Sequence, residues 1–400
     1  PSHPPMRDVY IVSAVRSAIG RFGGAFKKMS PPDVAAPVMS GAIEAADLPK
    51  EALDLVVFGN VLRAGHGQLV PRQAAIQAGI PKSIDAMAID MVCSSGMMST
   101  MNGASMIKAG DAELVLTGGV ESMSGAGFVQ DSGTRWGNKY APNGVTLHDV
   151  MHRDGLSDPM SGEAMGDQTE RLADDEDVSR EELDEVAFLS HKRATEATES
   201  GAFDDEIVPV EYRVRRETKT LTSDQGIRSE TTMDSLGSLR AAFKKDGKLT
   251  AGNSSQLSDG AAALVLASEE AVEEYGLTPI AKLGESAWSA GEPWRFPEAP
   301  LPAAQSVMEK LDMDSDDFDL VENNEAFAIN SVLMKRKLGI SYDKLNVHGG
   351  AIALGHPIGC SGARIVVTLL HALRAHDGEH GLASICHGTG GGTALSVHLV

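Results

Sequence analysis

The chain has 400 residues, of which 42% are hydrophobic, enough to bury one large core or several smaller ones. Its formal net charge of −21 comes from 56 acidic and 35 basic residues, and a surface of that sign repels nucleic acid and anionic lipid. Three cysteines without a CxxC pair argue against a disulfide framework and a structural zinc site. We therefore expect free thiols, a cytoplasmic protein and no nucleic-acid partner.

Two explanations of the acidic charge stay open. The runs ADDEDVSREELDEV and DMDSDDFD carry much of it, as in an ordinary soluble acidic enzyme or in a protein adapted to high salt.

The opening PSHPPMRDVYIVSAVR lacks the charged-then-apolar order of a secretory signal. We find no apolar stretch approaching the roughly 18 residues that cross a bilayer, so no membrane partner is expected.

Short apolar strands alternate with amphipathic helices along the chain. Strands are predicted at VYIVSAVRS (9–17), LVVFGN (55–60) and LVLTGGVES (114–122). The helix after Cys93 has its apolar residues at three- or four-residue steps, and this stripe is expected to be core: Met97, Met101, Ala104 and Ile107. Further strands are predicted at DGAAALVLAS (259–268), PIAKLGESAWS (279–289) and TALSVHLV (393–400). This alternation predicts an α/β fold with sheets covered by helices.

An internal repeat organises these elements. LDLVVFGN is answered by FDLVENNE, with 265 residues between the aspartates, and the Cys-Ser helix start at Cys93 returns 267 residues later at Cys360. We therefore predict an N-terminal half made of residues 6–121 plus 258–272 and a C-terminal half at 273–400. A polar insertion at 122–257 interrupts the first half. Similar halves bring equivalent strand and helix ends together, where clefts of α/β folds lie.

Cys93 is a candidate nucleophile. It stands at the head of its helix, where the free N–H groups and the helix dipole favour a thiolate. The small residues Ser94, Ser95 and Gly96 leave room for a substrate, and nearby backbone N–H groups can bind an oxyanion. A buried structural cysteine is the alternative. By position in the repeat alone, Cys360 would qualify equally.

Two glycine-rich stretches add further candidates. In NVHGGAIALGHPIGCSGAR, His356 is held between Gly355 and Pro357, which suits a positioned general base or a structural histidine. In ICHGTGGG, Cys386 ends a strand and is followed by glycines that let the backbone approach a ligand.

Three other motifs are rejected. HDGEH at 376 fits the spacing of a zinc-protease motif, but its glycine falls in a predicted turn instead of a continuous helix. GTGGG has no GK[ST] after it, so a phosphate loop is not expected. No G-x-S-x-G elbow is present, which argues against a serine hydrolase.

The motifs VCSSGM, GGVESMS, TAGNSSQLSDGAAA, NEAFA, GGAIALGHPIG and CHGTGGG resemble those of the thiolase family, in the family's order and over essentially the whole chain. The resemblance implies a five-layer αβαβα sandwich built from two βαβαβαββ halves, with a loop domain inserted in the first. It also implies acyl transfer between CoA thioesters.

The resemblance assigns roles motif by motif. Cys93 would carry the acyl group, His356 would be its base, and Cys386 would exchange the α-proton of the second acyl-CoA. Asn324, through a water, would join His356 in one oxyanion hole, and the N–H groups of Cys93 and Gly388 would form the other. Cys360, where the family has a small residue, would be a bystander.

CoA contacts are implied by the same matching. Arg228 would lie near the adenine and Ser255 near the pantetheine amide. The tunnel walls would be Leu156, Met165, Ala326 and Phe327. No metal or organic cofactor is implied beyond CoA as substrate and product. The sequence departs from the family pattern at Asp90, Ala164, Gln256, Phe296 and His348. Because Phe296 would lie at the wall of the acyl pocket, these departures leave the accepted acyl chain length undecided.

The implied reaction is the reversible condensation of two acetyl-CoA molecules. Alternatives are a 3-ketoacyl-CoA thiolase for longer chains, a decarboxylating relative, which Cys386 disfavours, and a non-catalytic acyl-CoA-binding subunit. The stretch TRWGNKYAPNGVTLHDVMHRDGL resembles the loop that pairs dimers, so a homotetramer is expected.

Overall fold

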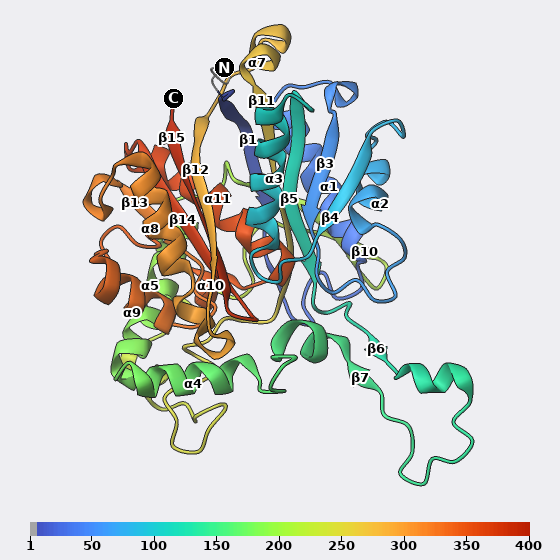
Figure 1. Ribbon diagram of the computed structural model, residues 1–400, viewed down its shortest axis with the longest axis vertical. Coiled ribbons are helices and arrows are strands. Elements are labelled where there is room, and N and C mark those ends of the chain that lie inside the picture. The colour runs from blue at the N-terminus through green and yellow to red at the C-terminus, as the bar shows by residue number, and fades with distance from the viewer. Residues whose placement is uncertain (1–5) are drawn as a thin grey trace, which may run out of the picture.

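One hydrogen-bonded path of strands runs through the molecule in the computed structural model, which describes residues 6–400 (Figure 1). Residues 1–5, part of the opening in which no secretory signal was found, lie outside the described residues. The path runs in the order β13-β14-β15-β12-β1-β11-β5-β3-β4. Its N-terminal strands are β1 (Val9–Ser17), β3 (Leu55–Gly59), β4 (Asp85–Ile89), β5 (Leu114–Ser122) and β11 (Ser258–Ser268). Its C-terminal strands are β12 (Ala281–Ala290), β13 (Leu320–Asn323), β14 (His380–His387) and β15 (Gly391–Leu399).

The strand order confirms the repeat. β1 and β12 meet in the middle as an antiparallel pair, from Val9 opposite Leu283 to Ile11 opposite Ala281. On either side follow the equivalent strands β11 and β15, then β5 and β14, then β3 and β13. The outer pairs, β3 with β5 and β13 with β14, are parallel in both halves.

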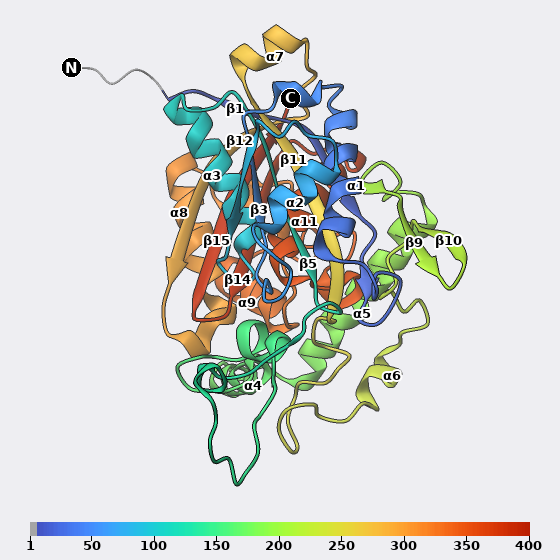
Figure 2. The ribbon, with the colours of Figure 1, turned by 90° about the vertical axis from the view of Figure 1, so that its right-hand side faces the viewer.

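Helices divide the molecule into five layers, as the αβαβα prediction requires, and the layers follow one another from left to right in Figure 1. Figure 2 looks at the same stack from the side of α1 and α2. The central layer is α3 (Ser95–Ala109) with α11 (Ile358–Ala375), which pack on each other and on strands of both halves. Outside the N-terminal strands lie α1 (Pro31–Ala45) and α2 (Val70–Gln77), and outside the C-terminal strands lies α8 (Pro300–Leu311).

Close packing of α3 against α11 brings the two helix starts together. The predicted stripe Met97, Met101, Ala104 and Ile107 is buried. A Cβ on Gly96 would come within 2.6 Å of the Ala363 nitrogen, and one on Gly362 within 2.4 Å of the Met97 nitrogen. Because only hydrogen fits at these two positions, the helices approach at their N-terminal ends, where the candidate site lies.

Helix α11 corrects one expectation. Its 18 residues are apolar enough to cross a membrane by length and composition, so the statement that no such stretch exists is wrong. In the fold, 83% of this helix is buried between the two sets of strands. The buried residues of the helix, with the paired polar groups of Arg364 and Thr368 among them, fit that central position.

The chain leaves the main strand path at Ser122 and returns to it at Ser258, and in between only Ile207 and Val208 pair with the sheet, beside β1. The segment between contains helices α4 (Met165–Asp175), α5 (Arg180–Glu199) and α6 (Met233–Gly237) and the short strands β6 (Phe128–Val129), β7 (His148–Asp149), β8 (Ile207–Val208), β9 (Val210–Val214) and β10 (Glu217–Leu221). The remaining elements are β2 (Gly20–Arg21), α7 (Glu269–Tyr275), α9 (Ile329–Leu338), α10 (Ala351–Leu354) and the short turns of helix η1 (Lys50–Ala52), η2 (Ser132–Trp136), η3 (His152–Leu156), η4 (Pro293–Glu298) and η5 (Ser315–Asp317). In Figure 1, α4 lies across the lower ends of the strands, and the segment between β6 and β7 projects away from the body.

Candidate active site

Cys93 lies in a tight turn between β4 and α3. The preceding residue, Val92, has a φ of 49°, a left-handed conformation that is costly for a β-branched side chain. The Ser95 hydroxyl holds the turn: it accepts a hydrogen bond from the Met91 N–H (2.8 Å) and donates to the Val92 carbonyl (2.5 Å). The turn therefore places Cys93, a partly exposed residue, just ahead of the helix cap, Ser94.

His356 is fixed by the turn before α11. Gly355 has a φ of 108°, and a Cβ there would lie 2.3 Å from the Ser258 hydroxyl, so the turn requires glycine. The His356 N–H donates to the Gln256 carbonyl and the Ser258 hydroxyl, at 3.1 Å each. These bonds orient the imidazole from the strand side.

The imidazole faces the thiol. His356 Nε2 lies 3.3 Å from Cys93 Sγ, and His356 Nδ1 lies 2.5 Å from the Ser361 hydroxyl. Because that hydroxyl donates to the Pro357 carbonyl (3.1 Å), its oxygen is free to accept the Nδ1 proton. We assign the Nδ1-H tautomer on this basis, which leaves Nε2 as the base towards Cys93. The Asn324 amide lies alongside, with Nδ2 3.5 Å from Nδ1, too far to displace Ser361.

The charge state of this pair corrects the sequence prediction of a resting thiolate. Burial raises the pKa of the Cys93 thiol, and a charge on Cys386 would raise it further. The backbone N–H groups of Gly388 and of Cys93 itself act in the opposite direction on that pKa, but do not outweigh burial. Burial also lowers the pKa of His356 to about 4. Desolvation of the charged forms acts against the thiolate that the helix end predicts, so burial favours a neutral thiol and a neutral imidazole.

Cys386 stands at the end of β14, and the Gly388-Thr389-Gly390 turn follows. Its sulfur accepts a hydrogen bond from Asn330 Nδ2 at 3.5 Å, and the same amide donates to the Pro297 carbonyl at 3.1 Å. Burial raises the pKa of the Cys386 thiol to about 12, against the effect of the Asn330 bond. Two neutral thiols and one neutral imidazole thus share the site.

The predicted catalytic residues Cys93, His356, Asn324, Cys386 and Gly388 are all brought together here. The Gly388 N–H favours the charged form of the Cys93 sulfur and so lies near it, and Asn324 Oδ1 is buried without a hydrogen-bond partner among residues 6–400. An unpaired buried oxygen of this kind is a place for a water or a substrate group.

An aromatic and thioether wall lies beside Gly388. Met165 Sδ is 3.0 Å from where a Cβ of Gly388 would stand. The Phe327 ring meets those of Phe296 and Phe243 edge-on, each with centroids 6.2 Å apart. Phe296 is buried and Phe243 is exposed, so this wall runs from the interior to the surface.

The other predicted CoA contacts lie around this wall or farther out. Leu156 packs in the same apolar cluster as Cys93, and the Ser255 N–H bonds the carbonyl of Ala326 (3.0 Å). Arg228 is exposed, and its backbone N–H donates a hydrogen bond to His191 Nδ1 (3.0 Å). Its side chain is not brought to the catalytic groups.

Two further candidates take no part in these contacts. His348 turns to His376, with their Nε2 atoms 3.2 Å apart, and packs against the Phe203 ring. Cys360 is buried inside α11.

Sequence reasoning missed three residues that position the site: Glu121, Asn330 and Ser361. The Glu121 carboxylate accepts backbone N–H bonds from Val61, Leu62 and Gly359, each at 3.0 Å, and so ties β5 to the start of α11. Burial raises the pKa of Glu121 to about 7, against the effect of those bonds. Ser361 lies five residues after His356, which is not the three- or four-residue spacing of a helix face, and nothing in the sequence indicates Asn330.

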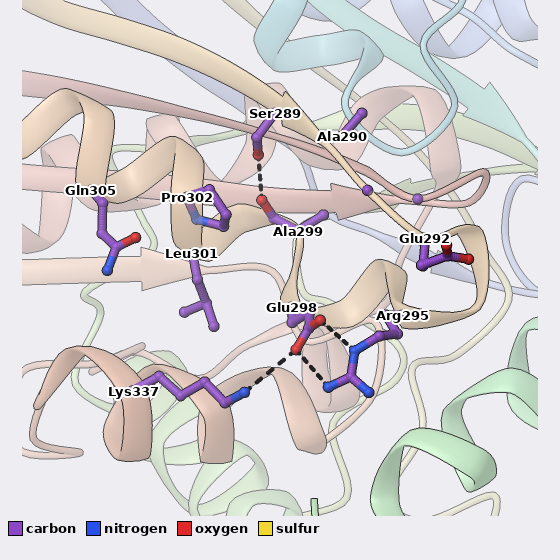
Figure 3. A pocket seen from close by; sticks show the side chains of 12 residues that line it. Ser289, Ala290, Glu292, Arg295, Glu298, Ala299, Leu301, Pro302, Gln305 and Lys337 are labelled. Atoms are coloured by element: carbon purple, nitrogen blue, oxygen red, sulfur yellow. Dashed lines mark hydrogen bonds and ion pairs between the residues drawn. The ribbon is translucent and has the colours of Figure 1, made fainter. Parts of the chain in front are cut away.

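A separate cavity of about 270 Å³ lies beside η4, between α8, α9 and the Gly390 turn (Figure 3). Its charged groups neutralise one another: Glu298 bonds the Arg295 guanidinium at 2.5 Å and Lys337 Nζ at 3.5 Å. Arg295 also pairs with Asp175 and Glu176 at the end of α4. The cluster therefore joins α4 to the segment that carries Phe296.

Comparisons with known proteins agree with the site. The family model "Thiolase, N-terminal domain" matches residues 9–270, and "Thiolase, C-terminal domain" matches residues 277–399. A protein of Synechocystis named acetyl-CoA acetyltransferase is 57% identical over 99% of this chain and 100% of its own length. One of the same name from Escherichia coli is 42% identical over 98% of this chain and 99% of its own.

Solved structures give the same result. The acetyl-CoA acetyltransferase of Bacillus anthracis superposes with a TM-score of 0.95 at 39% identity, covering 99% of both chains. Human mitochondrial 3-ketoacyl-CoA thiolase also reaches 0.95, at 37% identity, over 98% of this chain and 99% of its own. The two family models match nearly the whole chain, and the site holds the thiol-imidazole pair and a second thiol. The chain therefore belongs to the thiolase family.

Proposed function

We propose that this chain catalyses the reversible condensation of two acetyl-CoA molecules to acetoacetyl-CoA and CoA, through an acetyl thioester on Cys93. The observation that carries the proposal is the 3.3 Å contact between Cys93 Sγ and His356 Nε2 beside a second thiol, Cys386. The names of the relatives from Synechocystis and Escherichia coli support the acetyl substrate.

In the first half-reaction, His356 Nε2 takes the Cys93 proton as the sulfur attacks the thioester carbonyl. The N–H groups of Gly388 and Cys93 receive the oxyanion. The C–S bond to CoA breaks, and the leaving sulfur takes the proton of Cys386. Because burial disfavours the Cys93 thiolate before the substrate binds, its proton passes to His356 during the attack. This half leaves acetyl-Cys93, an imidazolium and a Cys386 thiolate.

In the second half-reaction, the Cys386 thiolate removes an α-proton from a second acetyl-CoA. Asn324 and the His356 imidazolium stand where they would stabilise the enolate oxygen, Asn324 acting through a water. The enolate carbon attacks acetyl-Cys93, the sulfur leaves, and His356 returns its proton to it. All three groups are then neutral again, and the exchange of one thioester for another keeps the acyl-transfer step nearly isoenergetic.

Mass spectrometry after incubation with acetyl-CoA tests this proposal. One acetyl group is expected on the peptide that contains Cys93, and none after Cys93→Ser. Cys360→Ser is the matched control and should still be acetylated, because that thiol lies inside α11. Acetylation of Cys386 or Cys360 in place of Cys93 contradicts the assignment.

The acyl pocket separates an acetyl-specific enzyme from one that accepts longer 3-ketoacyl-CoA, which similarity to the human enzyme keeps as a second candidate. The buried Phe296 and Phe327 rings favour the short chain, because they fill space that a longer acyl group would need. Phe296→Leu is expected to raise the ratio of kcat/KM for 3-ketohexanoyl-CoA to that for acetoacetyl-CoA. A wild-type preference for the longer substrate refutes the short-chain assignment.

We further propose that CoA binds along the inserted segment, with Arg228 and Ser255 among its contacts, and that no metal or organic cofactor takes part. The exposed guanidinium of Arg228 suits a phosphate. Arg228→Ala is expected to raise the KM for acetyl-CoA with little change in kcat, and prior dialysis against a chelator should not change the rate.

The projecting segment between β6 and β7 supports a homotetramer. Trp136 and Tyr140 there are 79% and 87% exposed, which is unusual for large aromatic side chains. We propose that these segments pair two dimers. Light scattering should give a tetramer for the wild type and a dimer after deletion of residues 132–146, whereas an unchanged mass after the deletion rules this segment out.

Fractionation of cells tests the cytoplasmic location, which the free thiols favour.

A further inference from the structure

We propose that Glu379, His380 and His398 form a binding site for a divalent transition-metal ion. The site lies at the start of β14, whereas Cys386 lies near its end. Six residues of strand separate His380 from Cys386, about 20 Å. The proposed site is therefore independent of the catalytic groups.

The two imidazoles already have the spacing of ligands on one ion. His380 and His398 are directly opposite each other in the antiparallel β14–β15 pair, so their side chains share a face. Their Nδ1 atoms are 3.2 Å apart and their ring centroids 4.4 Å. Two nitrogens bound tetrahedrally at the usual zinc distance would be about 3.3 to 3.4 Å apart.

A carboxylate completes the group. The ligand atoms of Glu379, His380 and His398 all lie within 4.8 Å of one another. Two imidazoles and one carboxylate, with no thiolate, suit Zn²⁺, Ni²⁺, Co²⁺ or Cu²⁺ and disfavour Mg²⁺, which takes oxygen ligands alone. A groove lined by Leu283, Phe318 and both histidines opens beside the group, so water can fill the remaining coordination positions.

The backbone holds these ligands in place. Asp319 Oδ2 accepts the N–H groups of Glu379 (2.8 Å) and His380 (2.9 Å), and the Leu399 N–H donates to the Glu379 carbonyl (2.9 Å). The Lys282 ammonium, on the strand beside His398, pairs with Asp8 at 3.1 Å, which offsets its repulsion of a cation. The backbone thus holds the ligands in position, and the charges of the neighbouring side chains named here sum to a negative value.

This arrangement gives the rejected HDGEH stretch another role. Two of its residues, Glu379 and His380, are used, but the third ligand comes from the opposite strand and not from the same helix. An ion there would cross-link β15 to β14. Because such an ion binds the folded chain and not the separated strands, it would stabilise the fold.

A second imidazole pair provides the discriminating control. His348 and His376 have their Nε2 atoms 3.2 Å apart, but His348 is buried against Phe203, and within residues 6–400 no third ligand group joins them. If spacing alone decided binding, this pair would also take the ion. His376→Gln removes this imidazole pair and leaves the proposed site unchanged.

The experiment is a calorimetric titration of tag-free, chelator-treated full-length protein with Ni²⁺, which imidazole binds well and which avoids the zinc affinity of the site thiols. One Ni²⁺ per chain is expected for the wild type and His376→Gln. At least a tenfold weaker affinity is expected for His380→Gln and for His398→Gln. Mg²⁺ should give no binding.

Thermal unfolding gives a readout that does not depend on activity. Ni²⁺ should raise the Tm of the wild type and of His376→Gln and leave that of His380→Gln and His398→Gln unchanged. The metal-free Tm of each variant establishes that it folds. The proposal is overturned if Ni²⁺ does not bind, if both strand variants bind it as the wild type does, or if only His376→Gln loses it.

Discussion

At the scale of single residues, the site combines groups that are each kept from ionising. Cys93 and His356 are in contact, yet burial favours the uncharged form of both. A nucleophile in this state is protected from reagents that need a thiolate. It becomes reactive when an acyl thioester arrives and the proton moves during the attack.

The pH dependence of alkylation checks this charge state. Since the pKa of Cys93 is raised above its usual range, the thiolate fraction should grow about tenfold for each pH unit up to pH 9 and beyond. The rate of iodoacetamide modification at Cys93, followed by peptide mass spectrometry, should rise in the same way. A plateau near pH 7 would mean that the resting group is a thiolate after all.

Ser361 provides a second prediction at this scale, as a positioning residue that holds His356 Nδ1. Ser361→Ala should lower kcat by up to about a hundredfold with little change in KM, because the ring loses its fixed tautomer and orientation. Ser361→Thr keeps the hydroxyl and should restore most of the rate. Equal losses in the two variants would point to packing and not to the hydrogen bond.

Single residues also mark what the sequence could and could not predict. The motifs placed Cys93, His356, Asn324, Cys386 and Gly388 in one site, because each stands at the end of a strand or helix whose position the repeat fixes. The charge state could not be predicted, because it depends on how much solvent the folded chain removes. The support from Asn330 comes from another segment and leaves no local pattern.

At the scale of elements, the Arg295 cluster connects the inserted segment to the wall of the site. The guanidinium joins Glu298 on η4 to Asp175 and Glu176 at the end of α4. Arg295→Ala should cost roughly 1–2 kcal/mol of unfolding free energy, because its side chain is only 20% exposed and its loss leaves Asp175 unpaired and Glu176 and Glu298 with Lys337 alone. Chemical denaturation measures this. Lys244→Ala, which removes an exposed partner of Asp174 on the same helix, should change nothing measurable.

The elements themselves were largely predictable. The strands at 9–17, 114–122 and 259–268 were expected from their apolar runs, and the structure has them at nearly those bounds. Helix α11 was misjudged as insufficiently apolar, because its glycines and Arg364 interrupt the pattern. The short strands of the insertion, such as β6 and β7, have no periodicity from which they could be predicted.

At the scale of the whole molecule, the net charge of −21 is the dominant feature. Like charges on a compact surface repel, and salt screens them over roughly 10 Å at 0.1 M ionic strength. The Tm should therefore rise when KCl is raised from a few millimolar to about 0.5 M. A parallel rise in activity up to molar salt would favour adaptation to high salt, and a Tm that falls with KCl would show that ion pairs outweigh repulsion.

The position of β11 has a consequence for biosynthesis. This strand fills the gap between β1 and β5, yet the ribosome makes it about 135 residues after β5. At ordinary elongation rates of about 5–20 residues per second, β5 waits roughly 7 to 27 seconds with an unpaired edge, and β1, which is made earlier, waits longer. During that interval the nascent chain exposes the kind of strand edge that chaperones cover, so cells that overproduce this protein should depend on them for yield.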